Sequence, residues 1–247
     1  MSITYINTSF NDSSGTSSLS ISKPTNTQTG DVMFAIICNL SYAYPNSSPT
    51  GWTLLAQQQP SSYHQIYYKI ATSSEPSSYS WGWQYSGKCG GIISTFRGSF
   101  NTSNLIHAYS ANQYTTSNTT VRANSMNISK TGLPLIFFAC GYENASIDYT
   151  KPSVPTSDWV ENYDDGSPAG DYYFEVCSMT WNSSGSTGNI DAIRSVSTSS
   201  SKQAFAVALN LISGPANVKT INGLEIASVK TLNGLEMASV KTIGGLA

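Results

Sequence analysis

The chain has 247 residues and a formal net charge of −2, and only 11% of its residues are charged, against about 25% in typical globular proteins. Its 12 lysines and arginines are scattered and form no basic stripe of the kind that a nucleic-acid partner needs. The longest apolar runs, residues 32–38 and 133–140, are too short to span a bilayer. We therefore expect neither nucleic-acid binding nor membrane insertion.

The first ten residues, MSITYINTSF, lack the basic start and the apolar run of a signal peptide. We expect synthesis in a cytoplasm without export by a cleaved signal. In a reducing compartment, buried free thiols are favoured over a disulfide framework, which is the alternative. This expectation covers four cysteines without Cys-x-x-Cys spacing, namely Cys38, Cys89, Cys140 and Cys177.

Short aromatic and β-branched segments recur along the chain, each bounded by Ser, Gly, Asn or Pro. The clearest are residues 63–71, 91–96, 172–176 and 203–209, and this composition is typical of strands. No stretch of a dozen residues shows a helical apolar period with caps. The sequence therefore predicts an all-β fold, with a β-sandwich or jelly-roll-like body.

The body contains an internal repeat. Residues 19–39 and 126–141 each read Ile-Ser-Lys, then Thr-Gly, then an apolar run ending in Cys, which aligns Cys38 with Cys140. Three further matches follow in the same order, Trp52 with Trp159, residues 67–71 with 173–177, and residues 90–96 with 202–209. We expect a body (1–213) of two similar β halves, about 20–100 and 125–212. Chance matching of Ser-rich strands is the alternative.

One motif resembles a nucleotide-binding loop. Gly82 to Lys88 fits the GxxxxGK start of a P-loop, but Cys89 stands where Ser or Thr would hold Mg²⁺. Trp83 and Tyr85 would also crowd a bound phosphate. We therefore expect no nucleotide site here.

Histidine chemistry has little support in the sequence. A zinc site needs Cys or carboxylate partners at ligand spacing, and no spacing supplies them to His64 or His107. No Gly-x-Ser-x-Gly elbow is present for a serine nucleophile. We expect both histidines to be satisfied surface or edge residues, and we expect no cofactor, no metal site and no catalytic residue.

Carboxylates gather late in the chain, at Asp158, Glu161, Asp164, Asp165, Asp171 and Glu175. A calcium site and an acid/base pair for glycoside hydrolysis are two functional interpretations. Because Asp164-Asp165-Gly166-Ser167-Pro168 reads as a turn, solvated loop residues are the simpler interpretation.

Aromatic residues are the best candidates for binding a glycan. Trp and Tyr offer flat apolar faces with a polar edge, and Trp81 and Trp83 alternate so that one sheet face carries both. We name Trp81, Trp83 and Tyr85 as candidate glycan-binding residues. A sandwich core, which uses alternating aromatics in the same way, is the alternative and is favoured for Trp52 and Trp159.

Residues 214–247 form a tail with an 11-residue repeat, VKTINGLEIAS, VKTLNGLEMAS and VKTIGGLA. The central Asn-Gly and Gly-Gly pairs predict short hairpins with two-residue turns. So short a segment cannot bury its apolar residues alone, although a flexible tail is the alternative. We expect contacts to sister chains or other proteins through Val218, Ile221, Leu224, Ile226, Val229, Leu232, Leu235, Met237, Val240, Ile243 and Leu246.

Several segments resemble β-sandwich domains of tailed-bacteriophage structural proteins: Thr29–Cys38, Gly51–Leu55, Tyr67–Ala71, Ser74–Trp81 and Ile93–Gly98. The Lys-Thr-Ile-Asn-Gly-Leu repeats resemble the short tails of phage virion proteins. The second half departs from the pattern, since it lacks the Phe-Arg-Gly close. The resemblance implies a non-enzymatic virion component, such as a head fibre, a head decoration or a tail protein, assembled in the host cytoplasm.

From this resemblance we expect a homo-oligomer that contacts other virion proteins through its tail. The alternative is a carbohydrate-binding adhesin that recognises a host surface glycan through the aromatic residues of the first half.

Overall fold

The computed structural model describes residues 3–40, 45–58, 63–114, 118–142, 147–154, 156–166, 172–198 and 201–212, together with 220–221, 224–225, 231–232 and 235–236 in the tail. All of the regular secondary structure assigned in these ranges is β-strand, which confirms the all-β prediction. Within the same residues no helix has the length and apolar character to cross a membrane.

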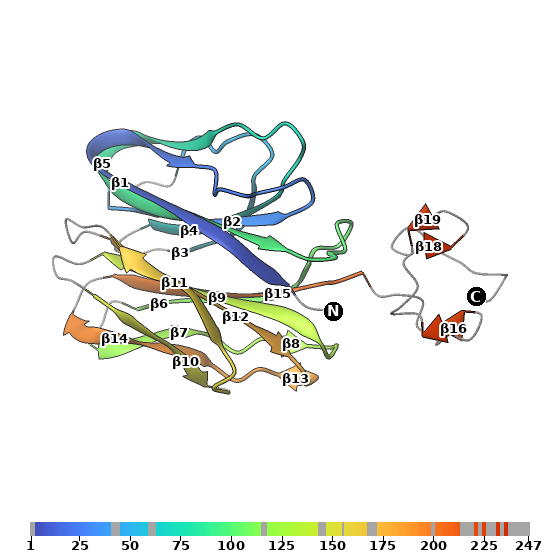
Figure 1. The fold of residues 1–247 in the computed structure, drawn as a ribbon. Coiled ribbons are helices and arrows are strands. Elements are labelled where there is room, and N and C mark those ends of the chain that lie inside the picture. Colours follow the sequence, from blue (N-terminus) through green and yellow to red (C-terminus); the bar gives the residue numbers. More distant parts are fainter. Residues whose placement is uncertain are drawn as a thin grey trace.

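The first half is one five-stranded antiparallel sheet. Its strands are β1 (Thr4–Ser22), β2 (Val32–Asn39), β3 (Thr53–Gln58), β4 (Tyr63–Ile70) and β5 (Ser78–Arg97), in the order β1-β5-β2-β4-β3. The long strands β1 and β5 change register near Ser13 and Thr16. Beyond that point they fold over the outer face of β2 and β4 and close a sandwich (Figure 1).

The second half has a five-stranded inner sheet, equivalent to the sheet of the first half, and a separate three-stranded outer sheet. The inner strands are β6 (Ile106–Tyr114), β9 (Leu133–Tyr142), β11 (Val160–Gly166), β12 (Tyr172–Trp181) and β15 (Lys202–Leu209), in the order β11-β12-β9-β15-β6. The outer sheet has the order β10-β14-β7, from β7 (Asn118–Ala123), β10 (Tyr149–Val154) and β14 (Ile190–Thr198). The short strands β8 (Asn127–Ile128) and β13 (Gly185–Ser186) pair with each other.

The two halves share one topology, which confirms the prediction of two similar halves. With Cys38 matched to Cys140, the order β1-β5-β2-β4-β3 corresponds to β6-β15-β9-β12-β11. Even the irregularities recur, because the ladder shifts between Leu54 and Ala56 in β3 and between Glu161 and Tyr163 in β11. The repeat also takes in β1 and β6, most of which lies outside the two ranges compared in the sequence.

The register corrects one detail of the predicted repeat. Cys38 lies opposite His64, and Cys140 lies opposite Phe174, so His64 corresponds to Phe174 and Tyr67 to Cys177. The sequence match of residues 67–71 with 173–177 is therefore wrong by four residues. An even slip keeps every side chain on its original face, which is why the apolar pattern did not reveal it.

The inner sheets of the two halves pack face to face (Figure 1). Contacts join β2 to β9, β5 to β12, β3 to β6 and β1 to β11. Because equivalent strands meet in reversed lateral order, an approximate twofold axis runs along the strands between the sheets. Equivalent strands of the two halves therefore run in the same direction and end at the same pole of the body.

Burial on both faces explains the continuous apolar strands. Phe34 and Ile36 of β2 lie in the central core between the halves, whereas Ala35 and Ile37 lie in the outer core of the first half. The Phe34 and Phe138 rings are 5.5 Å apart across the central core. Such strands show apolar runs in place of alternation.

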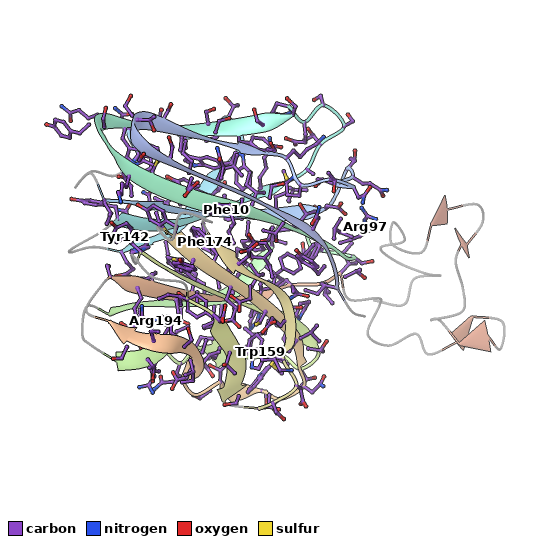
Figure 2. All side chains as sticks on the ribbon, turned by 60° about the vertical axis from the view of Figure 1, so that its left-hand side comes forward. Phe10, Arg97, Tyr142, Trp159, Phe174 and Arg194 are labelled. Atoms are coloured by element: carbon purple, nitrogen blue, oxygen red, sulfur yellow. The ribbon has the colours of Figure 1, made fainter. Side chains whose placement is uncertain are left out.

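The central core is also sealed by contacts between long strands of the two halves. Phe10 of β1 packs on Phe174 of β12, with 5.9 Å between ring centres (Figure 2). Tyr172 lies over Gly90, where a Cβ atom would come within 2.6 Å of the tyrosine ring. The hydroxyl of Tyr172 donates to the carbonyl of Lys88 at 2.8 Å. A glycine at position 90 is what permits this close approach.

In the tail, two pairs of short strands form hairpins. They are β16 (Thr220–Ile221) with β17 (Leu224–Glu225), and β18 (Thr231–Leu232) with β19 (Leu235–Glu236). Ile221 pairs with Leu224, and Leu232 with Leu235. This is the register that the Asn-Gly pairs predicted.

Candidate functional site

Two of the three candidate glycan-binding residues lie in the core. Trp81 is fully buried and packs edge-on against Trp52 at 5.5 Å, and Trp83 is only 4% exposed. Their alternation does place them on one face, but that face turns inward onto the outer core of the first half. The expectation that a glycan stacks on these two rings is therefore corrected, while Tyr85 is 57% exposed.

A groove lies where the edges of the two halves meet. It has a volume of about 540 Å³ and lies between β3 and β4 of the first half and β6 of the second. Its lining consists of Thr53, Leu54, Leu55, Tyr68, Ile106, His107, Ala108, Tyr109, Ser125, Met126 and Asn127. Leu54 is 42% exposed and Tyr109 is 50% exposed, so large apolar side chains face solvent at this groove.

His107 forms a fixed polar part of the groove. Its Nε2 accepts a hydrogen bond from the backbone N–H of Ser129 at 3.1 Å, so a neutral ring carries its proton on Nδ1. That nitrogen lies 3.1 Å from Oδ1 of Asn210 and donates to it. The expectation of a satisfied histidine is confirmed for His107, and the groove is partly polar at this point.

The opposite edge of the body serves as an internal comparison. The twofold axis relates the contact between β3 and β6 to the contact between β11 and β1. By register, Leu54 corresponds to Glu161 and Tyr109 to Thr8. The exposed apolar pair is therefore particular to the groove and is not required by the repeated fold.

The carboxylate cluster is only partly a solvated loop. Asp158, Glu161 and Asp165 are exposed, whereas Glu175 is fully buried in β12 and Asp171 lies outside the described residues. Asp164 pairs with Glu175 across the β11–β12 ladder and accepts a hydrogen bond from the backbone N–H of Tyr149 at 3.1 Å. The interpretation as loop residues is wrong for Glu161, Asp164, Asp165 and Glu175, which lie on strands β11 and β12, although Glu161 and Asp165 are exposed to solvent.

Both carboxyl groups hold their protons more tightly than usual. Burial, followed by the charges of Glu161 and other nearby carboxylates, raises the pKa of Asp164 to about 6. Burial, together with the charges of Asp164 and Glu161, raises the pKa of Glu175 to about 8. Because Glu175 is fully buried, a substrate could not reach it in this arrangement.

A second buried cluster joins the two halves at the central core. Cys38 of β2, His64 of β4 and Cys140 of β9 are fully buried, and their candidate ligand atoms all lie within 4.8 Å of one another. All four cysteines are free thiols, as expected. Burial, then the neighbouring Cys140 thiol, raises the pKa of Cys38. His64 is neither at the surface nor on an edge strand, so that expectation is wrong.

The P-loop-like segment is not a loop. Residues 82–88 lie within β5, and the backbone N–H of Gly82 donates to the carbonyl of Ser47 at 3.1 Å. A P-loop must connect a strand to a helix, which this strand does not do.

The predicted tail contacts concern side chains outside the described residues. These are Val218, Ile221, Leu224, Ile226, Val229, Leu232, Leu235, Met237, Val240, Ile243 and Leu246. What the structure describes is the point where the chain leaves the body. There, the backbone N–H of Ile212 donates to the carbonyl of Ser99 at 2.8 Å.

Comparisons with protein-family models, with curated proteins and with solved structures found no match to this chain. The fold itself is a duplicated β-sandwich followed by a tail with paired short strands.

Proposed function

We propose that this protein is a structural component of a tailed-phage virion, such as a head fibre, a head decoration or a tail protein, and that its repeated tail anchors it or joins sister chains. The observation that carries the proposal is the pairing of Ile221 with Leu224 and of Leu232 with Leu235 in two successive hairpins. Hairpins of this size are marginal in water on their own. Their apolar residues are stabilised when they pack on a partner.

The polarity of the body supports this arrangement. Ser99 and Ile212 lie at the pole where β5 and β15 end, and the N-terminal strand also begins there (Figure 1). Asn39 and Tyr142, the last residues of β2 and β9, lie at the opposite pole. If the tail attaches the protein to the particle, the pole with Ser99 and Ile212 faces the particle and the opposite pole faces outward.

The test compares the oligomeric state and incorporation of the full chain with those of a chain lacking residues 214–247. Deletion is expected to yield a folded monomer that does not enter particles. The full chain carrying Ile221→Ser and Leu224→Ser should show the same loss, whereas Val160→Ser, at a body residue that is 58% exposed, should not. Normal assembly by the deleted chain would overturn the anchoring role.

A second candidate function is binding of a host surface glycan, and the groove between the halves is the observation that favours it. Tyr109 offers a half-exposed ring beside the polar groups of Asn127 and Ser125, and an aromatic face with nearby polar groups suits a sugar. A glycan array with the full chain tests this function. Binding at the groove should be lost in Tyr109→Ala and kept in Tyr85→Ala, which removes a tyrosine of similar exposure outside the groove lining. The reverse result would place the glycan at Tyr85, the candidate that the sequence named.

A further inference from the structure

The Cys38, His64 and Cys140 cluster combines residues that are distant in sequence. Cys38 and His64 lie opposite each other on neighbouring strands of the first half, and Cys140 comes from the second half. The approximate twofold axis brings the two equivalent cysteines together where the inner sheets meet. The result is two sulfur atoms and an imidazole, mutually within 4.8 Å and fully buried.

The second half shows that a histidine is not needed for packing here. His64 corresponds to Phe174, which fills the same position in the central core. Burying an imidazole in place of a phenyl ring costs free energy unless its nitrogens are engaged. The first half thus carries a potential ligand where the repeated fold accepts a purely apolar residue.

We propose that Cys38, His64 and Cys140 bind one Zn²⁺ ion that joins the two halves. Thiolate and imidazole are the ligands that zinc prefers. In a tetrahedral site with Zn–S bonds of about 2.3 Å and Zn–N bonds of about 2.0 Å, the ligand atoms lie about 3.5–3.8 Å apart. Since the ligand atoms lie within 4.8 Å of one another, the cluster would have to contract by no more than about 1.3 Å to reach these distances.

Charge favours a divalent ion over a monovalent one. On binding, each thiol loses its proton to solvent, and two thiolates with a neutral imidazole carry a charge of −2. A Zn²⁺ ion makes the buried group neutral, whereas Cu⁺ would leave a net negative charge in a low-dielectric core. The fourth position would be taken by water, as in zinc sites with three protein ligands.

The inference goes beyond the virion role and does not depend on it. An ion held by β2, β4 and β9 would link the halves and stabilise the folded chain, because it binds the assembled site and not the unfolded chain.

The test uses the full chain, produced in zinc-supplemented medium and purified under reducing conditions. Metal analysis should find about one zinc per chain. Cobalt substitution should produce the sulfur-to-metal charge-transfer band of a site with two thiolates. Thermal unfolding should shift to higher temperature when zinc is restored to the chelated protein.

Variants separate the site from general effects of cysteine loss. Cys140→Ser and His64→Phe should each lower zinc affinity at least tenfold, and His64→Phe should still fold because Phe174 fills the equivalent position. Cys89→Ser and Cys177→Ser, at buried thiols outside the cluster, should keep full zinc content. A metal-free wild-type chain, a Cys38–Cys140 disulfide found by mass spectrometry, or unchanged zinc in Cys140→Ser would each overturn the inference.

Discussion

Glu175 makes the stability of this protein depend on pH in a direction opposite to that of most acidic residues. Its Oε1 accepts a hydrogen bond from the Cys177 thiol at 3.0 Å. Burial nevertheless raises its pKa from 4.5 to about 8, and the charges of Asp164 and Glu161 add to the effect. The equivalent residue in the first half is Gln65, so Glu175→Gln replaces the carboxyl group with the amide that the other half already uses.

The magnitude follows from the two pKa values. The folded state binds the Glu175 proton more tightly than the unfolded state, so this stabilisation is fully present below about pH 4.5 and is lost as the pH rises through about 8. Each tenfold change in proton affinity corresponds to about 1.4 kcal/mol. Ionisation of Glu175 therefore lowers the free energy of unfolding by less than about 1 kcal/mol at pH 5 and by as much as about 5 kcal/mol at pH 9.

Urea unfolding of the wild type and of Glu175→Gln at about pH 5 and about pH 9 measures this difference. The variant should gain stability over the wild type mainly at the higher pH. Asp165→Asn, at an exposed carboxylate of the neighbouring strand, is the matched control and should change little at either pH. An equal effect of Glu175→Gln at both pH values would refute the assigned role of the buried carboxyl group.

Three further predictions concern stability. Burial acts to raise the pKa of Glu75, but hydrogen bonds, including one from Lys69, outweigh it and lower the pKa to about 2. Because solvent screens this partly exposed site, Glu75→Gln should cost about 1 kcal/mol at neutral pH and little near pH 2, measured by thermal unfolding at both. Gly90→Ala should destabilise the chain by about 1–3 kcal/mol in urea unfolding, because the new Cβ would lie 2.6 Å from the Tyr172 ring; a neutral effect would show that the sheets separate easily. Trp81→Ala should cost about 3–5 kcal/mol in the same assay, and a cost below about 1 kcal/mol would contradict its place in the core.

The fold could be predicted from the sequence because its strands carry their own signals. Residues 204–209 are apolar throughout, and the structure buries both faces of β15. The repeat was visible because Cys38 and Cys140 end matching apolar runs. The correct alignment of β4 with its equivalent strand β12 was not visible in the sequence, because a shift of four residues leaves the same side chains facing inward.

The clusters of functional interest could not be predicted in the same way. Cys38, His64 and Cys140 come from three strands and two halves, so no local spacing resembles a metal motif. The groove depends on β3 and β6 meeting across the twofold axis, which makes neighbours of Leu54 and Tyr109. Trp81 and Trp83 were misassigned for a different reason, since alternation shows that residues share a face but not which way that face points.

The duplication offers a way to separate residues that maintain the fold from residues that serve a function. Where the halves agree, as at Trp52 and Trp159, both side chains are buried, and packing alone accounts for them. Where they differ at a position that either residue can fill, packing does not explain the choice. His64 with Phe174 is such a pair.

Leu54 with Glu161 is a second such pair, and it lies on the surface. The glutamate shows that this edge of the fold tolerates a charge, so the fold does not require an exposed leucine at the groove. Leu54 shares the groove lining with the half-exposed Tyr109, and it is exposed apolar residues grouped in this way that mark a binding surface. The strongest candidates for binding in the body are therefore its asymmetric positions, and replacing each residue with its counterpart from the other half tests them with substitutions that the fold already accommodates.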